Sequence, residues 1–79
     1  MARILFTGTH GPDDPTRATM PFHMANGAVE AGHQVSISLM VDAPLVLKNE
    51  IRDATNGFAT PPLKDLFQFA IENGVRVYV

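Results

Sequence analysis

The chain opens with an apolar run that does not alternate with polar residues. Ile4, Leu5 and Phe6 follow one another, and a polar, glycine-containing stretch comes directly after them at positions 7–14. A parallel strand covered by helices on both sides is apolar on both faces, whereas a half-exposed strand alternates. The pattern therefore predicts a strand over residues 4–6 that is buried on both faces and is followed by a turn.

The next segment has the period of a helix, and we expect this helix over residues 15–31. Asp13 or Asp14 can cap it, Pro15 suits its first turn, and Gly32 suits the left-handed position after its end. Pro21 lacks the amide hydrogen that an interior helical residue donates, which predicts a late start or a kink. The predicted buried side consists of Ala18, Phe22, Ala25 and Val29, and Met20, Met24, Ala28 and Ala31 flank it. The predicted polar side consists of Thr19, His23, Asn26 and Glu30.

A second strand is predicted over residues 34–41, where polar and apolar residues alternate at first. Ser36 and Ser38 are expected to face a less dry side, which places this strand near an edge of the sheet. Asp42 then caps a short helical piece that starts at Ala43, with Pro44 in its first turn. Residues 49–52 continue or restart that helix.

The last part of the chain is predicted to form a loop, a helix and a third strand. Residues 53–60 contain an Asn-Gly turn signal and no period, and the residue pair Pro61-Pro62 precedes a helix that Asn73-Gly74 ends. The buried positions of this helix are Leu63, Leu66, Phe67, Ala70 and Ile71. Residues 75–79 form the third strand. The fold class is α/β, a parallel sheet with flanking helices in βαβαβ order, and residues 1–79 form a single domain.

Composition narrows the function classes. The net charge of −2 and the pI near 5.8 provide no basic surface for a phosphate backbone, so we expect no nucleic-acid partner. No apolar run is long enough to span a bilayer and no signal-peptide pattern opens the chain, which favours a cytoplasmic protein without a membrane role. Cysteine is absent, so the 79 residues contain no disulfide, thiolate metal site or thiol nucleophile. With 46% hydrophobic residues in so short a chain, some apolar surface needs a partner.

The candidate site is the turn that follows the first strand, because ligands bind at the carboxyl ends of parallel strands. Thr7, Gly8, Thr9, His10 and Gly11 are predicted to form a polar ligand pocket, and Asp42 follows the second strand at the same edge. The glycine spacing matches neither the dinucleotide motif nor a phosphate loop, and Asp13 and Asp14 repel a phosphate, so a nucleotide is disfavoured. No cofactor is predicted. The alternative interpretation of this segment is simple turn geometry, with Asp42 only capping a helix.

Other reactive side chains lack the neighbours that chemistry requires. His10 can act as an acid or base or lie on a solvated loop, whereas His23 and His33 complete neither a triad nor a metal site. We assign no catalytic residue and no metal ligand, and the 79 residues do not favour an enzyme. Phe58 in the loop and Phe69 on the polar side of the last helix are expected to pack locally or to contact another subunit.

Taken in order, several segments resemble the DsrE/DsrF-like family of small α/β proteins of sulfur relay. They are Ile4-Leu5-Phe6 with Thr7-Gly8, Asp14-Pro15-Thr16-Arg17-Ala18, Ala31-Gly32-His33-Gln34-Val35, Val41-Asp42-Ala43, Pro62-Leu63-Lys64-Asp65-Leu66 and Gly74-Val75. The resemblance implies a flavodoxin-like three-layer sandwich, assembly as a homotrimer or homohexamer, and a protein partner in sulfur relay.

The resemblance also implies a cysteine that carries sulfur as a persulfide just after the strand at residues 75–79. No residue here takes that role. Either the domain continues beyond Val79 to a cysteine, or the chain is a cysteine-free relative that supplies scaffold and pocket wall. The alternative function, from a different class, is a noncatalytic oligomeric module that binds a small ligand.

Overall fold

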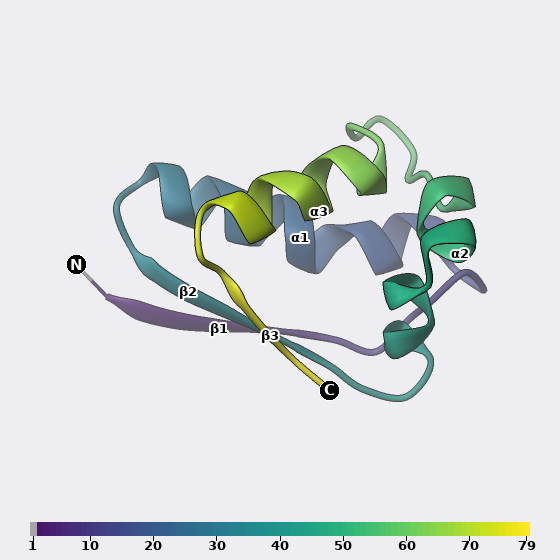
Figure 1. Cartoon of the computed structure of the whole chain (residues 1–79), viewed down its shortest axis with the longest axis horizontal. Coiled ribbons are helices and arrows are strands. Elements are labelled where there is room, and N and C mark those ends of the chain that lie inside the picture. The colour runs from purple at the N-terminus through teal and green to yellow at the C-terminus, as the bar shows by residue number, and fades with distance from the viewer. Residues whose placement is uncertain (1) are drawn as a thin grey trace.

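A computed structural model describes residues 2–79 (Figure 1). Strand β1 (Arg3–Gly8) leads to helix α1 (Pro15–Glu30), and strand β2 (Gln34–Leu39) follows. A 3₁₀ helix η1 (Ala43–Leu47) and helix α2 (Asn49–Ala54) come next, so the predicted second helical piece does restart. Helix α3 (Leu63–Glu72) then leads to strand β3 (Arg76–Tyr78). The βαβαβ order and the parallel α/β class predicted from the sequence are confirmed.

The three strands form one parallel sheet in the order β1-β2-β3. Arg3 pairs with Gln34 and Gly8 with Leu39, while Ser36 pairs with Arg76. The prediction that the second strand lies near an edge is wrong, because β2 is the central strand. Both helical connections have the same hand, so each new strand adds on the same side of the previous one.

Helices α1 and α3 cover one face of this sheet, whereas η1 and α2 lie beyond its carboxyl end (Figure 1). Ile37 and Leu39 of β2 are buried on that face with Phe22 of α1 and Leu63 of α3. The opposite face has no helix over it within the described residues, and Leu5 is 60% exposed there. The prediction that the first strand is buried on both faces is therefore wrong, although Ser36 and Ser38 do face the wetter side. This arrangement is a sheet with one of the two helix layers of a flavodoxin-like sandwich.

Helix α1 begins at Pro15, so the predicted late start is wrong. Asp14 caps it, because its carboxylate accepts a hydrogen bond from the Arg17 amide at 3.2 Å. Pro21 lies buried inside the helix against Gly8, where an added Cβ would come within 2.9 Å of the proline ring. Gly32 has the expected positive φ of 90° after the last turn.

Two residues predicted for the polar side of α1 are buried. The Thr19 hydroxyl donates to the carbonyl of Pro15 at 2.7 Å, and Asn26 Nδ2 donates to the carbonyl of Leu66 in α3 at 2.9 Å. The buried side of α1 is wider than predicted because the helix packs against both the sheet and α3. Met24, predicted to flank the buried side, is exposed.

Helix α3 confirms most of its predicted buried side, with Leu63, Leu66 and Ala70 in the core and Phe67 partly buried. Ile71 was predicted to be buried and is 50% exposed. The Phe67 ring lies 5.7 Å from the ring of Phe22 and stacks under the guanidinium of Arg52 at 4.2 Å. These contacts join α3 to α1 and to the end of α2.

Candidate functional site

The predicted site residues do come together at the carboxyl ends of β1 and β2. The Met40 amide, just after β2, donates to the carbonyl of Gly8 at 2.8 Å. Gly11 lies so close to the backbone of Asp42 that an added Cβ would overlap the Asp42 carbonyl oxygen. The parallel topology therefore brings the turn at residues 7–11 and Asp42 to one edge of the sheet, as predicted.

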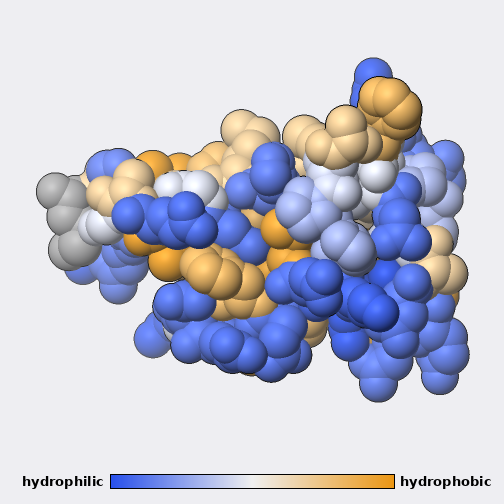
Figure 2. All heavy atoms as spheres, turned by 90° about the horizontal axis from the view of Figure 1, so that it is seen from above, coloured by the Kyte–Doolittle hydropathy of each residue, from blue (hydrophilic) through white to orange (hydrophobic). Residues whose placement is uncertain are grey.

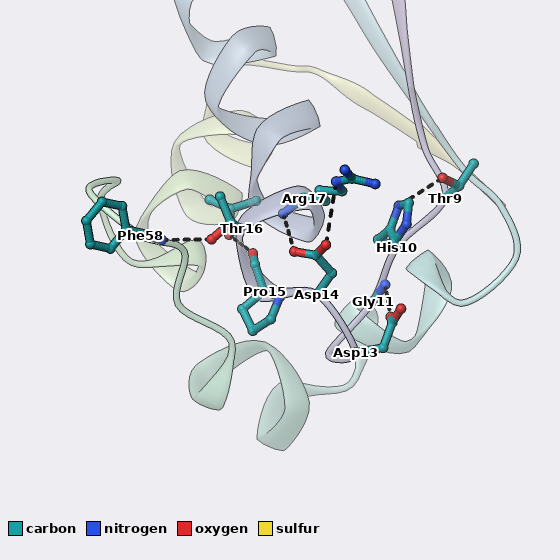
Figure 3. A network of polar contacts seen from close by, with 10 residues as sticks. Thr9, His10, Gly11, Asp13, Asp14, Pro15, Thr16, Arg17 and Phe58 are labelled. Atoms are coloured by element: carbon teal, nitrogen blue, oxygen red, sulfur yellow. Dashed lines mark hydrogen bonds and ion pairs between the residues drawn. The ribbon is translucent and has the colours of Figure 1, made fainter.

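The turn is closed by hydrogen bonds among its own residues (Figure 3). Thr9 Oγ1 and His10 Nδ1 are 3.1 Å apart. The Gly11 amide donates to Asp13 Oδ1 at 2.9 Å, and the Asp14 amide donates to the Gly11 carbonyl at 3.0 Å. These bonds fix the path from the end of β1 to the start of α1.

A carboxylate already occupies the amino end of α1. Asp14 accepts from the Arg17 amide and forms an ion pair with the Arg17 guanidinium, with Nε and Oδ2 3.5 Å apart (Figure 3). A helix amino end favours an anion, and here the protein supplies its own. A phosphate would meet Asp13 and Asp14 at this place, which supports the prediction that a nucleotide is disfavoured.

Asp42 does not have the predicted capping role. Its side chain makes no capping hydrogen bond at the start of η1, whereas its backbone carbonyl accepts from the Leu45 amide at 3.2 Å. Val41, just before it, has a positive φ of 57° and an exposed side chain. Asp42 itself has a helical backbone, with φ −93° and ψ −7°, whereas a side chain that caps a helix usually comes from an extended residue.

A cleft of about 250 Å³ lies between the end of β1 and the first half of α1. Arg17, His10 and the two threonines of the turn supply its polar groups. Its lining residues are Phe6, Thr7, Gly8, Thr9, His10, Arg17, Met20, Pro21 and Met24. Asp13 and Asp14 are not among them, and neither are Gly11 and Asp42, which were predicted as site residues. The cleft thus combines a cationic group and hydroxyls with a wall of methionine, phenylalanine and proline.

A loop that the sequence analysis did not connect with this edge also lies beside the start of α1. The Phe58 amide donates to Thr16 Oγ1 at 3.0 Å, and the Phe58 ring is 86% exposed (Figure 3). Local packing of this aromatic ring, one of the two expectations, is therefore wrong, and its anchoring residue was not predicted. A bond between residues 42 positions apart leaves no signal in the local sequence.

The remaining histidines do not line the cleft. His33 Nδ1 accepts from the Ala2 amide at 3.1 Å at the other end of the sheet, and His23 is exposed on α1. Across residues 2–79, no three side chains of His, Cys, Asp or Glu gather as a metal site would require. None of the helices in that part of the chain is both long and apolar enough to cross a membrane.

The uncovered face of the sheet carries a larger groove, of about 630 Å³. We call it the open sheet face and define it by the exposed or partly exposed side chains of its three strands, which are Arg3, Leu5, Gln34, Ser36, Ser38, Arg76 and Tyr78. This groove is separate from the cleft between β1 and α1. In the sequence, only the two serines of the central strand indicated that this side of the sheet is wetter.

Comparison with known proteins gives one match. The family model of the DsrE/DsrF-like family matches residues 2–79, which is essentially the whole chain. No curated protein and no solved structure matches significantly.

Proposed function

Since the chain belongs to the DsrE/DsrF-like family, we propose that it acts in sulfur relay as a scaffold that holds a sulfur-bearing side chain of another protein. The observation that carries this proposal is the family match over residues 2–79, taken together with the lack of cysteine among the 79 residues. These residues supply no thiol that could take up sulfur, so the role proposed for them is binding and positioning.

The cleft at the end of β1 is the proposed place of binding. A deprotonated persulfide is a negatively charged, polarisable group, and Arg17 and His10 offer donors to such an anion. Met20 and Met24 form a soft, adaptable wall. A volume of about 250 Å³ accommodates one side chain that ends in two sulfur atoms.

The proposal has four further parts, which concern compartment, domain, assembly and partner, and the family match supports the last three. The chain works in the cytoplasm, residues 1–79 form one domain unit, and copies associate as a homotrimer or homohexamer. Its partner in sulfur relay is a protein that carries the cysteine. The chain is apolar but can form only a small core, and this also favours association of copies.

A second candidate function is a noncatalytic module that binds a small polar ligand through Thr7–Gly11. The convergence of this turn with Asp42 at one sheet edge favours it. Such a ligand would use the hydroxyls and backbone of the turn rather than the charge of Arg17.

The test compares glutathione persulfide with reduced glutathione. We expect the persulfide to shift the amide NMR signals of residues 7–11 and Arg17, while the intact mass of the chain gains no sulfur. Arg17→Gln should weaken this binding about tenfold or more, because a charge-assisted contact is lost. Lys48→Gln, at an exposed site away from the cleft, should leave it unchanged.

Equal binding of both compounds, with no effect of Arg17→Gln, would replace sulfur relay with the polar-ligand module. If neither compound shifts the signals of the turn, the cleft is not the place of sulfur binding.

A further inference from the structure

The pair Asn-Gly occurs three times in this chain, at residues 26–27, 56–57 and 73–74. In such a pair the backbone nitrogen of the glycine can attack the side-chain carbonyl of the asparagine, because the glycine has no side chain that hinders the approach. The reaction needs a free side-chain amide and a free backbone N–H. The three pairs are identical in sequence and differ only in what these two groups bind in the folded chain.

The first pair is held at both groups. Asn26 is buried, and its Nδ2 donates to the Leu66 carbonyl of α3 at 2.9 Å. Gly27 lies within α1, where backbone amides donate to the carbonyl four residues earlier. Attack at this pair would require the middle of α1 to open and Asn26 to leave its contact with α3.

The third pair is held at the end of α3. Asn73 Nδ2 donates to the Phe69 carbonyl at 2.8 Å, and the Gly74 amide donates to the Ile71 carbonyl at 3.3 Å. Gly74 has the positive φ, 75°, that is common just after a helix. Both reacting groups are therefore engaged, and the end of α3 has to fray before they can meet.

The second pair, in the loop between α2 and α3, differs at both groups. Asn56 is exposed, and neither its side-chain amide nor the Gly57 amide takes part in the hydrogen bonds described for residues 2–79. This loop is the uppermost segment in Figure 1, and the view from above in Figure 2 shows hydrophilic and apolar side chains together on that face. Water therefore reaches the pair in the folded chain.

The packing of the same loop explains why position 57 is a glycine. A Cβ there would come within 2.7 Å of Thr60 Oγ1 and within 3.2 Å of the Thr16 Cα. A larger residue would have to displace these neighbours. The contact of the loop with α1 thus requires the one residue type that leaves the attack unhindered.

We propose that Asn56-Gly57 is a site of spontaneous deamidation and that the fold protects the two other pairs. The Gly57 nitrogen forms a bond to Asn56 Cγ, the Cγ–Nδ2 bond breaks, and ammonia leaves with the proton of the Gly57 amide. Water then opens the resulting five-membered succinimide ring at one of its two carbonyls. Opening at Cγ gives aspartate, opening at the main-chain carbonyl gives isoaspartate, and neither step oxidises or reduces the chain.

Isoaspartate would lengthen the main chain by one methylene group between two anchored residues. On one side Thr55 is buried, and its hydroxyl donates to the Ile51 carbonyl at 2.6 Å. On the other side the Phe58 amide donates to Thr16 Oγ1 at 3.0 Å (Figure 3). Because Thr55 is buried and Phe58 is exposed, the longer chain should release Phe58 from Thr16. The modification would free the loop from the start of α1 and add a negative charge to it, independently of any role in sulfur relay.

Peptide mass spectrometry of the folded 79-residue chain, incubated at mildly alkaline pH, tests this proposal. Trypsin separates the three pairs, which lie in the fragments 18–48, 53–64 and 65–76. The fragment with Asn56 should gain the mass that separates a carboxylic acid from an amide on the order of tenfold faster than the other two, whose hydrogen bonds must open first. In the chain unfolded by guanidinium chloride, the three rates should converge.

Two variants and one product complete the experiment. Asn56→Gln should lose the modification in its fragment, because its longer side chain would have to close a six-membered ring, whereas Asn73→Gln should leave the rate at Asn56 unchanged. Circular dichroism verifies that both variants are folded. Electron-transfer fragmentation identifies isoaspartate, and the purified isoaspartate chain should show shifted amide NMR signals of Thr16 and Phe58.

Three outcomes would overturn the proposal in whole or in part. Equal rates at the three pairs in the folded chain would refute protection by the fold, and a faster gain at Asn26 or Asn73 would refute the choice of Asn56. A fragment with Asn56 that gains mass only after unfolding would refute the site itself. Unchanged signals of Thr16 and Phe58 in the isoaspartate chain would refute the release of the loop.

Discussion

Gly11 is the residue at which the two turns of the candidate site touch. A Cβ at this position would overlap the carbonyl oxygen of Asp42, and backbone cannot move aside as the end of a flexible side chain can. We therefore expect Gly11→Ala to lower the free energy of unfolding by about 1–3 kcal/mol and to shift the NMR signals of residues 7–11 and 40–43.

Gly27 provides the matched control for that substitution. It lies inside α1 with open space around the site of a Cβ, so Gly27→Ala should raise the free energy of unfolding by about 1 kcal/mol. Both variants are measured by urea unfolding. If Gly11→Ala is as stable as wild type, the turns at the ends of β1 and β2 are not in contact.

Single residues also show where sequence reasoning stops. The convergence of Thr7–Gly11 with Asp42 follows from parallel topology, so the place of the candidate site could be predicted. The burial of Asn26 could not, because its partner, the Leu66 carbonyl, lies 40 positions away. Its other amide atom, Oδ1, is buried without a hydrogen-bond partner among residues 2–79, a condition that no sequence pattern indicates.

At the scale of elements, the cap of α1 could be predicted because it depends on local groups. Asp14 accepts the Arg17 amide and Pro15 occupies the first turn. Asp14→Ala should therefore cost about 1 kcal/mol of stability and increase amide hydrogen exchange in the first turn of α1.

Asp53→Ala is the control for that charge change, because Asp53 is exposed at the end of α2 and forms none of the described hydrogen bonds. It should leave stability and exchange in α1 unchanged. Equal effects of the two variants would mean that net charge, and not the cap, accounts for the change.

The elements that were predicted less well depend on neighbours. The apolar run of β1 predicted burial on both faces, but a strand with helices on one side buries only alternate residues, here Ile4 and Phe6 in part. The same one-sided cover explains the exposure of Leu5. Ile71 of α3 is exposed for a related reason, since it faces away from α1 and the sheet.

At the scale of the molecule, a chain of 79 residues buries only about 60% of the surface that its unfolded form exposes, so its stability margin is small. The association of copies proposed above would bury further apolar surfaces of the folded chain. Because only the folded chain presents these surfaces, association should stabilise the fold by mass action.

This linkage predicts that the thermal midpoint of the wild-type chain rises with protein concentration. Over a range of about 100-fold centred on the dissociation constant, the stabilisation should change by about 1.4 kcal/mol, which corresponds to a rise of roughly 5–11 °C for a domain of this size. Differential scanning calorimetry at a series of protein concentrations measures the shift. A wild-type midpoint that does not move with concentration would show that association of copies contributes nothing to the stability of the fold.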